Sequence, residues 1–247
     1  MWSLLRARPQ NNELYNAIPN RHTNRNPYDP KRVVPTQFVD ALRRLPDDES
    51  DIKIFLVTAD ADRKKIAEII SAANNVLYAD PEVQRGSERW IRIRWSSVQK
   101  YRDGLTIDAA GLPPLTAAVA KFVPSSVLRW MVSEKEDPYL KLLQTPAIFG
   151  IIAARDRYDQ QHSLRAGRVW QRAHLLATSH ELAARPANEA VEMVDHERKL
   201  GQEPRHEKLL AWLTGDATWQ PTFTFYMGYP IRPAAASPRR SVQDVVL

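Results

Sequence analysis

The chain contains no cysteine, has only eight glycines, and carries no long apolar run in its 247 residues. The absence of cysteine excludes disulfide bonds, thiolate metal ligands and a cysteine nucleophile. The longest uncharged run, residues 217–231, contains a glutamine and two prolines, and is shorter than the roughly 18 apolar residues that a membrane helix needs. The first residues show neither a long apolar segment nor a small-residue cleavage site. We therefore expect a cytoplasmic protein with no membrane association.

The rest of the composition is typical of a globular domain. Hydrophobic residues make up 43% and charged residues 26% of the chain, which are ordinary values for a folded protein. The net charge of +6 is spread over interspersed residues of both signs, whereas a nucleic-acid-binding protein concentrates its basic residues in a stripe. We expect one domain over residues 1–247 and no nucleic-acid partner.

Three apolar segments predict strands, at residues 52–57, 147–153 and 222–227. The first and last are rich in branched and aromatic residues, and the middle one lacks alternation, as a strand buried on both faces does. Spacing of apolar residues, capping residues and prolines predict helices. These helices cover residues 1–20, 36–45, 62–73, 82–100, 159–184, 187–200 and 204–213. Strands separated by several helices predict an α+β sandwich with a central sheet covered by helices.

Residues 103–124 differ in character from the segments around them. They contain two glycines and three prolines among small apolar residues. Such a composition favours irregular structure over one continuous helix. We expect a long excursion or lid within the single domain.

Two arginine clusters bracket the chain, Arg-His-Thr-Asn-Arg at residues 21–25 and Ser-Pro-Arg-Arg at residues 237–240. Arginine guanidinium groups match phosphate oxygens, often with two hydrogen bonds at a time. If the fold brings the clusters together, they form a phosphate pocket from opposite ends of the sequence. Each cluster taken alone is equally explained as a solvated turn or tail.

No other pattern indicates a catalytic or metal site. No histidine pair has the spacing of a His-Glu-x-x-His zinc site, and neither a nucleophile elbow nor a phosphate-binding glycine loop occurs. All histidines except His22 are expected at the surface or packed in the core. Trp90, Trp95, Trp130 and Trp170 lie in helical patterns, which favours core or subunit contacts over base stacking. This picture fits an enzyme whose chemistry resides in a cofactor.

The segment from residue 21 to residue 28 resembles the opening signature of the flavin-dependent nitroreductases, Arg-Arg-Ser-x-Arg. The chain is most similar to the dormancy-associated Acg-type branch of that superfamily. Residues 101–105 and 164–178 carry this similarity, and so do residues 227–230 together with residues 237–240. The similarity spans nearly the whole chain, and it rests on the order and spacing of short motifs.

The resemblance implies a nitroreductase-like sandwich, with a central antiparallel or mixed sheet flanked by helices, and FMN as cofactor. It places the arginine clusters at the FMN phosphate and ribityl chain, and the loop at residues 185–188 at the flavin ring. The implied cofactor-binding residues are Arg21, His22, Thr23, Arg25, Ala187, Asn188, Arg239 and Arg240. The implied reaction is two-electron reduction of a nitro compound or quinone by NAD(P)H. The implied assembly is a homodimer that binds FMN at its interface.

One departure from the family pattern bears on function. The chain lacks the Pro-Ser-x-x-Asn-x-Gln-Pro-Trp segment whose asparagine lies near the flavin in nitroreductases. Because Acg-type chains resemble two fused nitroreductase halves with that segment in the first half, we expect this chain to represent the second half alone. Two alternatives to an active enzyme follow: a non-catalytic flavin-sequestering stress protein, and a fragment that is either inactive or functions only with a complementing half-chain.

Overall fold

The computed structural model describes residues 12–122 and 137–246. Within them the helices are α1 (Glu13–Ala17), α2 (Thr36–Arg43), α3 (Asp60–Ala79), α4 (Pro81–Glu88), α5 (Trp95–Tyr101), α6 (Pro114–Ala120), α8 (Pro138–Leu143), α9 (Gln160–Ser179), α10 (Glu189–Lys199) and α11 (Arg205–Thr214). The strands are β1 (Ile52–Val57), β2 (Ile91–Arg92), β3 (Leu105–Thr106), β4 (Ile148–Ala154), β5 (Ala183–Pro186) and β6 (Gln220–Gly228). Short 3₁₀ turns are η1 (Ile18–Asn20), η2 (Ile107–Ala110) and η3 (Val242–Asp244).

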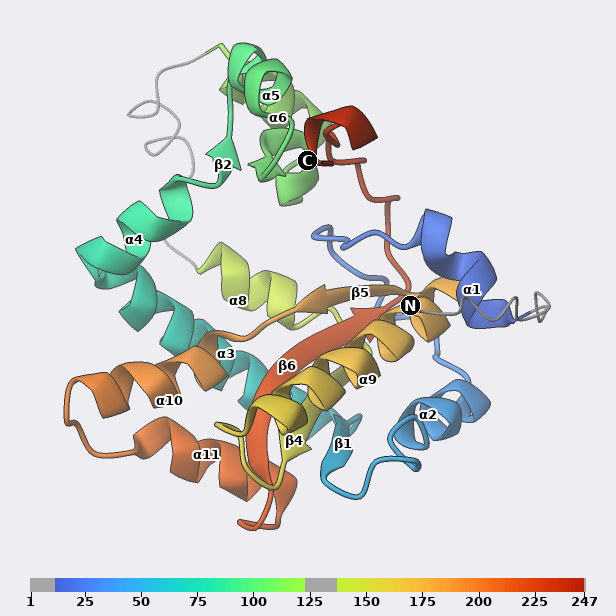
Figure 1. The fold of residues 1–247 in the computed structure, drawn as a ribbon, viewed down its shortest axis with the longest axis vertical. Coiled ribbons are helices and arrows are strands. Elements are labelled where there is room, and N and C mark those ends of the chain that lie inside the picture. The colour runs from blue at the N-terminus through green and yellow to red at the C-terminus, as the bar shows by residue number, and fades with distance from the viewer. Residues whose placement is uncertain (1–11, 123–136, 247) are drawn as a thin grey trace, which may run out of the picture.

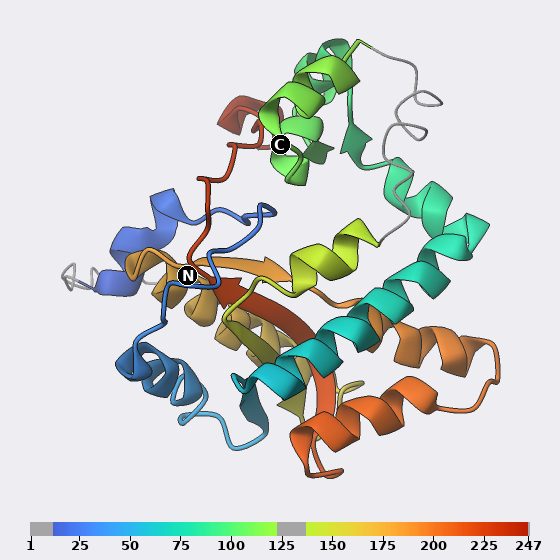
Figure 2. The ribbon, with the colours of Figure 1, turned by 180° about the vertical axis from the view of Figure 1, so that it is seen from behind.

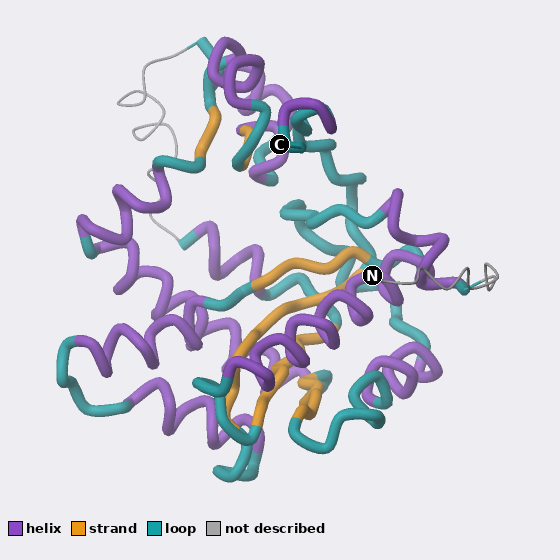
Figure 3. Tube along the Cα trace, in the orientation of Figure 1, coloured by secondary structure: helices purple, strands orange, loops and turns teal. Residues whose placement is uncertain are grey.

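A four-stranded sheet forms the centre of the molecule, with strand order β1-β4-β6-β5. Every neighbouring pair in it is antiparallel. Helix α9 covers the face that is nearer the viewer in Figure 1, and α3 covers the opposite face, as Figure 2 shows. Figure 3 displays the same arrangement, with the orange strands enclosed between purple helices. The predicted α+β sandwich with a central antiparallel sheet is therefore confirmed.

Alternating side chains of the inner strands supply a hydrophobic core on each face of the sheet. Phe149, Ile151 and Tyr226 belong to the core beneath α3 and α10. Ile152 and Phe225 belong to the core beneath α2 and α9. All seven residues of β4 are buried, which explains why its sequence is apolar without alternation. The three strands that the sequence predicted are thus confirmed, with small differences at their ends.

The prediction of one helix over residues 82–100 is wrong. Helix α4 ends at Glu88, strand β2 pairs in parallel with β3, and α5 begins at Trp95. Trp90 and Trp95 are 61% and 64% exposed, so neither is a core residue, and the other expected role, a subunit contact, stays a prediction. Both side chains lie on a small peripheral unit, residues 90–122, and do not pack against the central sheet. Trp130 lies outside the described residues.

The long helix is shorter than predicted at its C-terminal end. Asp159 caps its first turn by accepting a hydrogen bond from the His162 N–H. It ends at Ser179, and Glu181 then takes a left-handed φ of 60° that reverses the chain. Residues 183–186 form the edge strand β5, where a terminal proline is tolerated. Thr36 is the first residue of α2 and makes no side-chain cap, because Pro35 occupies the cap position.

The peripheral unit, residues 90–122, lies apart from the central sheet and close to η3 (Figures 1 and 2). It contains β2, β3, α5, α6 and η2. The expected irregular segment therefore has regular elements between residues 105 and 120, and residues 123 and 124 lie outside the described residues. Gly111, at a φ of +87°, packs against the Arg25 carbonyl so closely that a β-carbon there would overlap it. Gly111 therefore brings the peripheral unit into contact with Arg25 of the N-terminal arginine cluster.

In the described part of the chain, no helix has the length and apolar character needed to cross a bilayer.

The contact between β4 and β6 gives a test of this core. A β-carbon at Gly150 would overlap the ring of Phe225, so we expect Gly150→Ala to lower the free energy of unfolding by about 1–3 kcal/mol through overpacking. Gly167, on the exposed side of α9, has open space around it. Gly167→Ala should raise that free energy by about 0.5–1 kcal/mol. Urea unfolding of both variants checks the pair, and equal stabilities would contradict the packing described.

Candidate functional site

The two arginine clusters meet at one cavity of about 200 Å³. The N-terminal cluster, the start of β3 and the C-terminal tail surround it. Its lining residues are Arg21, His22, Thr23, Arg25, Gly104, Leu105, Ala235, Ser237 and Arg239. We call this cavity the basic pocket. The sequence placed five of these residues in a cofactor site, whereas it singled out Gly104 and Leu105 only as part of a similarity motif and of the expected lid.

Backbone pairing holds the two ends of the chain together. The Asp29 N–H donates to the Tyr229 carbonyl at 2.8 Å, and the Ile231 N–H donates to the Pro27 carbonyl at 3.1 Å. The stretch that follows the first arginine cluster therefore runs beside the stretch that follows β6. These hydrogen bonds continue the antiparallel pairing of the central sheet toward the basic pocket.

Two buried asparagines extend the connection into the first arginine cluster. The Asn24 side-chain amide donates to the Arg232 carbonyl at 2.8 Å. Asn26 donates to the Asn24 side-chain oxygen from its backbone N–H and its amide, both at 2.9 Å, and to the Pro233 carbonyl at 3.2 Å. Sequence reasoning missed this role. The available signal was the alternation of asparagine with arginine, since asparagine pairs readily with backbone groups.

The basic pocket concentrates hydrogen-bond donors and positive charge. All of its polar side chains among the described lining residues can donate hydrogen bonds, and none of these residues is a carboxylate. Within residues 12–122 and 137–246, no carboxylate lies within 4 Å of Arg21, Arg25 or Arg239, although many other arginines are paired. Burial lowers the pKa of Arg25, and the nearby charge of Arg185 lowers it further. A bound anion would compensate this concentration of positive charge.

Three of the predicted site residues do not line the basic pocket. Arg240 donates to Asp103 at 2.6 Å, and Asp103 also pairs with Arg92 at 2.8 Å. Ala187 is buried, and its backbone N–H donates to the Thr224 carbonyl at 2.9 Å. Arg240 therefore fastens the C-terminal tail to the peripheral unit, and the Ala187 N–H already has a partner.

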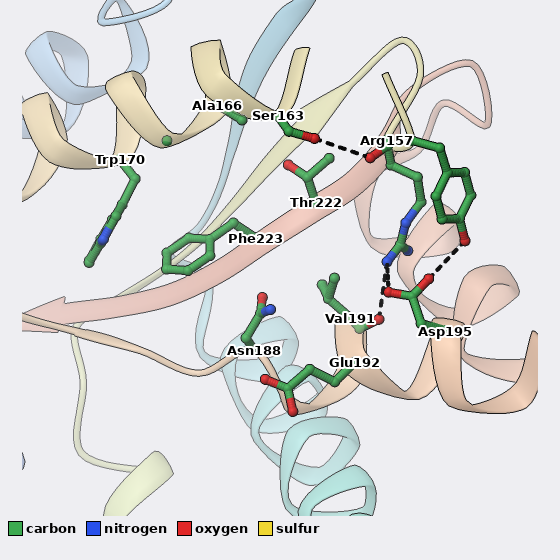
Figure 4. Close-up of a pocket in the computed structure, with 12 residues that line it drawn as sticks. Arg157, Ser163, Ala166, Trp170, Asn188, Val191, Glu192, Asp195, Thr222 and Phe223 are labelled. Carbon is green, nitrogen blue, oxygen red and sulfur yellow. Dashed lines mark hydrogen bonds and ion pairs between the residues drawn. The ribbon is translucent and has the colours of Figure 1, made fainter. Parts of the chain in front are cut away.

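Asn188, the third of these residues, lines a second cavity, of about 330 Å³, between α9, α10 and β6 (Figure 4). Its side-chain oxygen accepts the Thr224 N–H at 3.1 Å. Trp170 and Phe223 form an aromatic wall, with ring centroids 4.9 Å apart. An ion pair between Arg157 and Asp195, at 2.9 Å, lies at the other end of the cavity in Figure 4. This second cavity is lined by both polar and apolar side chains. One arginine lines it, whereas three line the basic pocket.

A buried polar cluster lies next to the predicted flavin-ring loop. The Tyr139 hydroxyl donates to Glu189 at 2.7 Å, and the Arg185 guanidinium carbon lies 5.4 Å from the Tyr139 ring. Burial raises the pKa of Glu189, an effect that Tyr139 and Arg185 partly oppose. The Tyr226 hydroxyl is buried and has no hydrogen-bond partner within 3.5 Å. Within the described residues, one carboxylate oxygen of Glu189 also lacks a hydrogen-bond partner, and the Arg185 guanidinium carbon of β5 lies 5.8 Å from the Tyr226 ring.

His174 is a buried histidine that contacts the basic pocket. It is 1% exposed. Of the two locations expected for this histidine, the surface and the core, the structure shows the core. Its Nδ1 lies 3.4 Å from the Arg21 guanidinium, and its Nε2 lies 3.2 Å from the His22 carbonyl. Burial, together with the smaller effect of the nearby Arg21 charge, lowers the pKa of His174 to about 4. The imidazole is therefore neutral at physiological pH.

Comparison with known proteins identifies the fold. No family model and no curated protein matches the sequence. Among solved structures, an FMN-bound nitroreductase from Bacteroides fragilis aligns over 96% of this chain and 98% of its own, with 13% identity and a TM-score of 0.57. The FMN-dependent nitroreductase NfnB from Mycobacterium smegmatis, in complex with NADPH, aligns over 95% and 97%, with 17% identity and a TM-score of 0.54.

A third similar structure is an iodotyrosine deiodinase bound to FMN and 3-iodo-L-tyrosine. It aligns over 93% of this chain and 96% of its own, with 10% identity and a TM-score of 0.52. At such identities the likeness establishes the fold alone. The chain has the nitroreductase fold, and the sequence-based expectation of that fold is confirmed.

His174 predicts a loss of stability in acid. In the unfolded chain its pKa is near 6.5, whereas in the folded protein it is about 4. Because the unfolded state then binds more protons, the free energy of unfolding falls as the pH is lowered through this interval. Between pH 7.5 and pH 5 we expect His174 to account for a loss of about 2 kcal/mol. Urea unfolding should show this loss in the natural protein and not in His174→Gln; equal losses would contradict it.

Proposed function

We propose that the protein binds FMN through the basic pocket and acts in the cytoplasm as an NAD(P)H-dependent oxidoreductase of the nitroreductase type. The observation that supports this most is the convergence of Arg21, Arg25 and Arg239 on one cavity that no carboxylate of the described residues lines. The nitroreductase fold and the FMN in the similar structures give the cofactor class. Arg21, His22, Thr23, Arg25 and Arg239 would then hold the phosphate.

The dimensions of the basic pocket suit the phosphate end of FMN. Its volume of about 200 Å³ is below the roughly 300–1,000 Å³ of pockets that enclose a whole drug-sized ligand. A phosphate monoester brings between about −1.5 and −2 charges at neutral pH and three acceptor oxygens. Those oxygens match the guanidinium and hydroxyl donors of the pocket. The flavin ring would lie outside the pocket, and we propose residues 185–188, including Ala187 and Asn188, as its neighbours.

When bound, FMN supplies two-electron chemistry between NAD(P)H and an acceptor such as a nitro compound or a quinone. The residues of this chain would bind the phosphate, orient the ring and exclude water. Gly104 and Leu105 line the basic pocket, and Gly111 packs against Arg25. We therefore retain the lid as a proposal, in which residues 103–124 cover the phosphate end of the cofactor.

We propose that the protein forms a homodimer, with a complementing half-chain as the alternative partner. The peripheral unit exposes large apolar side chains, among them Trp90, Trp95, Leu115 and Phe122, the last two 83% and 88% exposed. Exposed apolar groups of this size favour contact with another surface. We also propose that the chain belongs to the Acg-type branch. Within that branch it would correspond to the half that lacks the Pro-Ser-x-x-Asn segment.

A second function is a non-catalytic flavin store. The observation that favours it is the contact between the peripheral unit and the N-terminal cluster, because a covered phosphate would slow release of the cofactor. A store binds FMN that NADPH does not reduce. An enzyme binds FMN that NADPH reduces rapidly.

The adjacent arginines Arg239 and Arg240 give a matched test of the cofactor site. Loss of a charge-assisted phosphate contact in Arg239→Ala should weaken FMN binding by about 1.5–3 kcal/mol, or roughly 10- to 100-fold. Arg240→Ala should change it less than about threefold, because Arg240 is bonded to Asp103. Flavin fluorescence quenching measures both affinities. Unchanged binding in the double variant Arg21→Ala plus Arg239→Ala would show that the site assignment is wrong.

A visible absorption spectrum tests the proposed function itself. We expect a flavin spectrum that persists when the protein is mixed with excess FMN and then dialysed. Anaerobic addition of NADPH should bleach it within seconds to minutes if the protein is an enzyme, and leave it unchanged if it is a store. A colourless protein that takes up no FMN would contradict both functions.

A further inference from the structure

His174 is the one side chain from the long helix α9 whose ring contacts two successive residues of the basic pocket. Its Nε2 lies 3.2 Å from the His22 carbonyl, and its Nδ1 lies 3.4 Å from the Arg21 Nη1. The first residue of the arginine cluster and the backbone of the second are thus both connected to the core helix. Neither contact was evident from the sequence, which separates these residues by about 150 positions.

These two partners fix the protonation state of the imidazole. The His22 carbonyl can only accept a hydrogen bond, so Nε2 must carry the hydrogen. The Arg21 guanidinium can only donate, so Nδ1 must be the bare acceptor. A protonated ring would direct a second N–H at the Arg21 guanidinium. The observed arrangement therefore requires the neutral tautomer with hydrogen on Nε2.

The charged and titratable groups that face the imidazole are few. Arg21 and His22 approach it from the N-terminal segment. On its own helix, the Trp170 ring lies 5.0 Å from it, and the Thr178 hydroxyl bonds to its backbone carbonyl. Both ionisable neighbours carry or can acquire positive charge. No described carboxylate lies within 4 Å of the ring, so a proton acquired by His174 would have no counter-charge and would repel Arg21.

From this geometry we propose that His174 is a positioning residue of the basic pocket, and that its protonation in acid releases a phosphate-bearing ligand. As a neutral acceptor it holds the Arg21 guanidinium at the pocket and fixes the backbone of His22. The identity of the ligand as FMN rests on the proposed function, whereas the role of His174 concerns any phosphate monoester. Ligand binding by the basic pocket then depends on pH through His174, in addition to its dependence on the titration of the phosphate.

The test compares FMN with riboflavin, which has the same ring and no phosphate. His174→Phe fills a similar volume without a hydrogen-bonding nitrogen, and His174→Gln retains an acceptor and a donor but does not titrate. At pH 7.5 we expect His174→Phe to weaken FMN binding about tenfold, the size of one lost bond to a charged group, and to leave riboflavin binding unchanged. His174→Gln should keep FMN affinity within about threefold of the natural protein.

The pH profile supplies the second measurement. Between pH 5.5 and pH 3.5, the interval in which a group with a pKa of about 4 takes up its proton, the affinity of the natural protein for FMN should fall more steeply than that of His174→Gln, which retains only the titration of the phosphate. Parallel profiles would overturn the proposal. So would equal weakening of FMN and riboflavin in His174→Phe, or no weakening of either. If His174→Phe does not fold, the comparison of profiles with His174→Gln decides the question.

Failure of the proposed function gives a different result. If the natural protein binds neither flavin, the same variants are titrated with inorganic pyrophosphate by calorimetry. A loss of pyrophosphate binding in His174→Phe, with retention in His174→Gln, supports the positioning role in a pocket that serves another phosphate ligand. Binding that is equal in all three proteins, or absent from the natural protein, overturns it.

Discussion

The alignment of residues 24–29 with residues 229–233 is the constraint on which the rest of the site depends. Two backbone hydrogen bonds and the side chains of Asn24 and Asn26 hold these segments together. Without this pairing, the two arginine clusters would be separate stretches of surface. With it, three cationic side chains from opposite ends of the sequence lie around one cavity. The free energy needed to bring like charges together comes from buried hydrogen bonds and from the core beneath them.

The arginines at this site are held in three ways that the sequence does not distinguish. Arg239 lies at the basic pocket, whereas Arg240, the next residue, pairs with Asp103 of the peripheral unit. One arginine thus serves the cavity and its neighbour fastens the tail that carries it. Arg21 is held in a third way, by a neutral histidine from α9. Since that histidine brings no charge, it orients the guanidinium without neutralising it, which leaves the cation available to an anionic ligand.

Much of the fold could be predicted from the sequence because it depends on local patterns. The apolar run at residues 147–153 indicated a strand buried on both faces, and β4 is that strand. The edge strand β5 could not be predicted, because residues 183–186 continue the helical spacing of α9 and become a strand only by pairing with β6. The break between α4 and α5 was missed for a related reason. Trp90 and Trp95 lie in a stretch for which the sequence predicts a helix, but both are exposed on the peripheral unit, away from the central sheet.

The sequence by itself determined which residues could hold a phosphate, because guanidinium and hydroxyl groups have that chemistry in any fold. It also determined, through the absence of cysteine and of histidine pairs, that thiolate and helix-borne zinc sites are excluded. Only the tertiary structure decided that Arg21, Arg25 and Arg239 share a cavity, that Arg240 does not, and that His174 supports it. The physical reason is that these contacts join residues more than a hundred positions apart. Their distances are set by the packing of helices against the sheet and by no local preference of the chain.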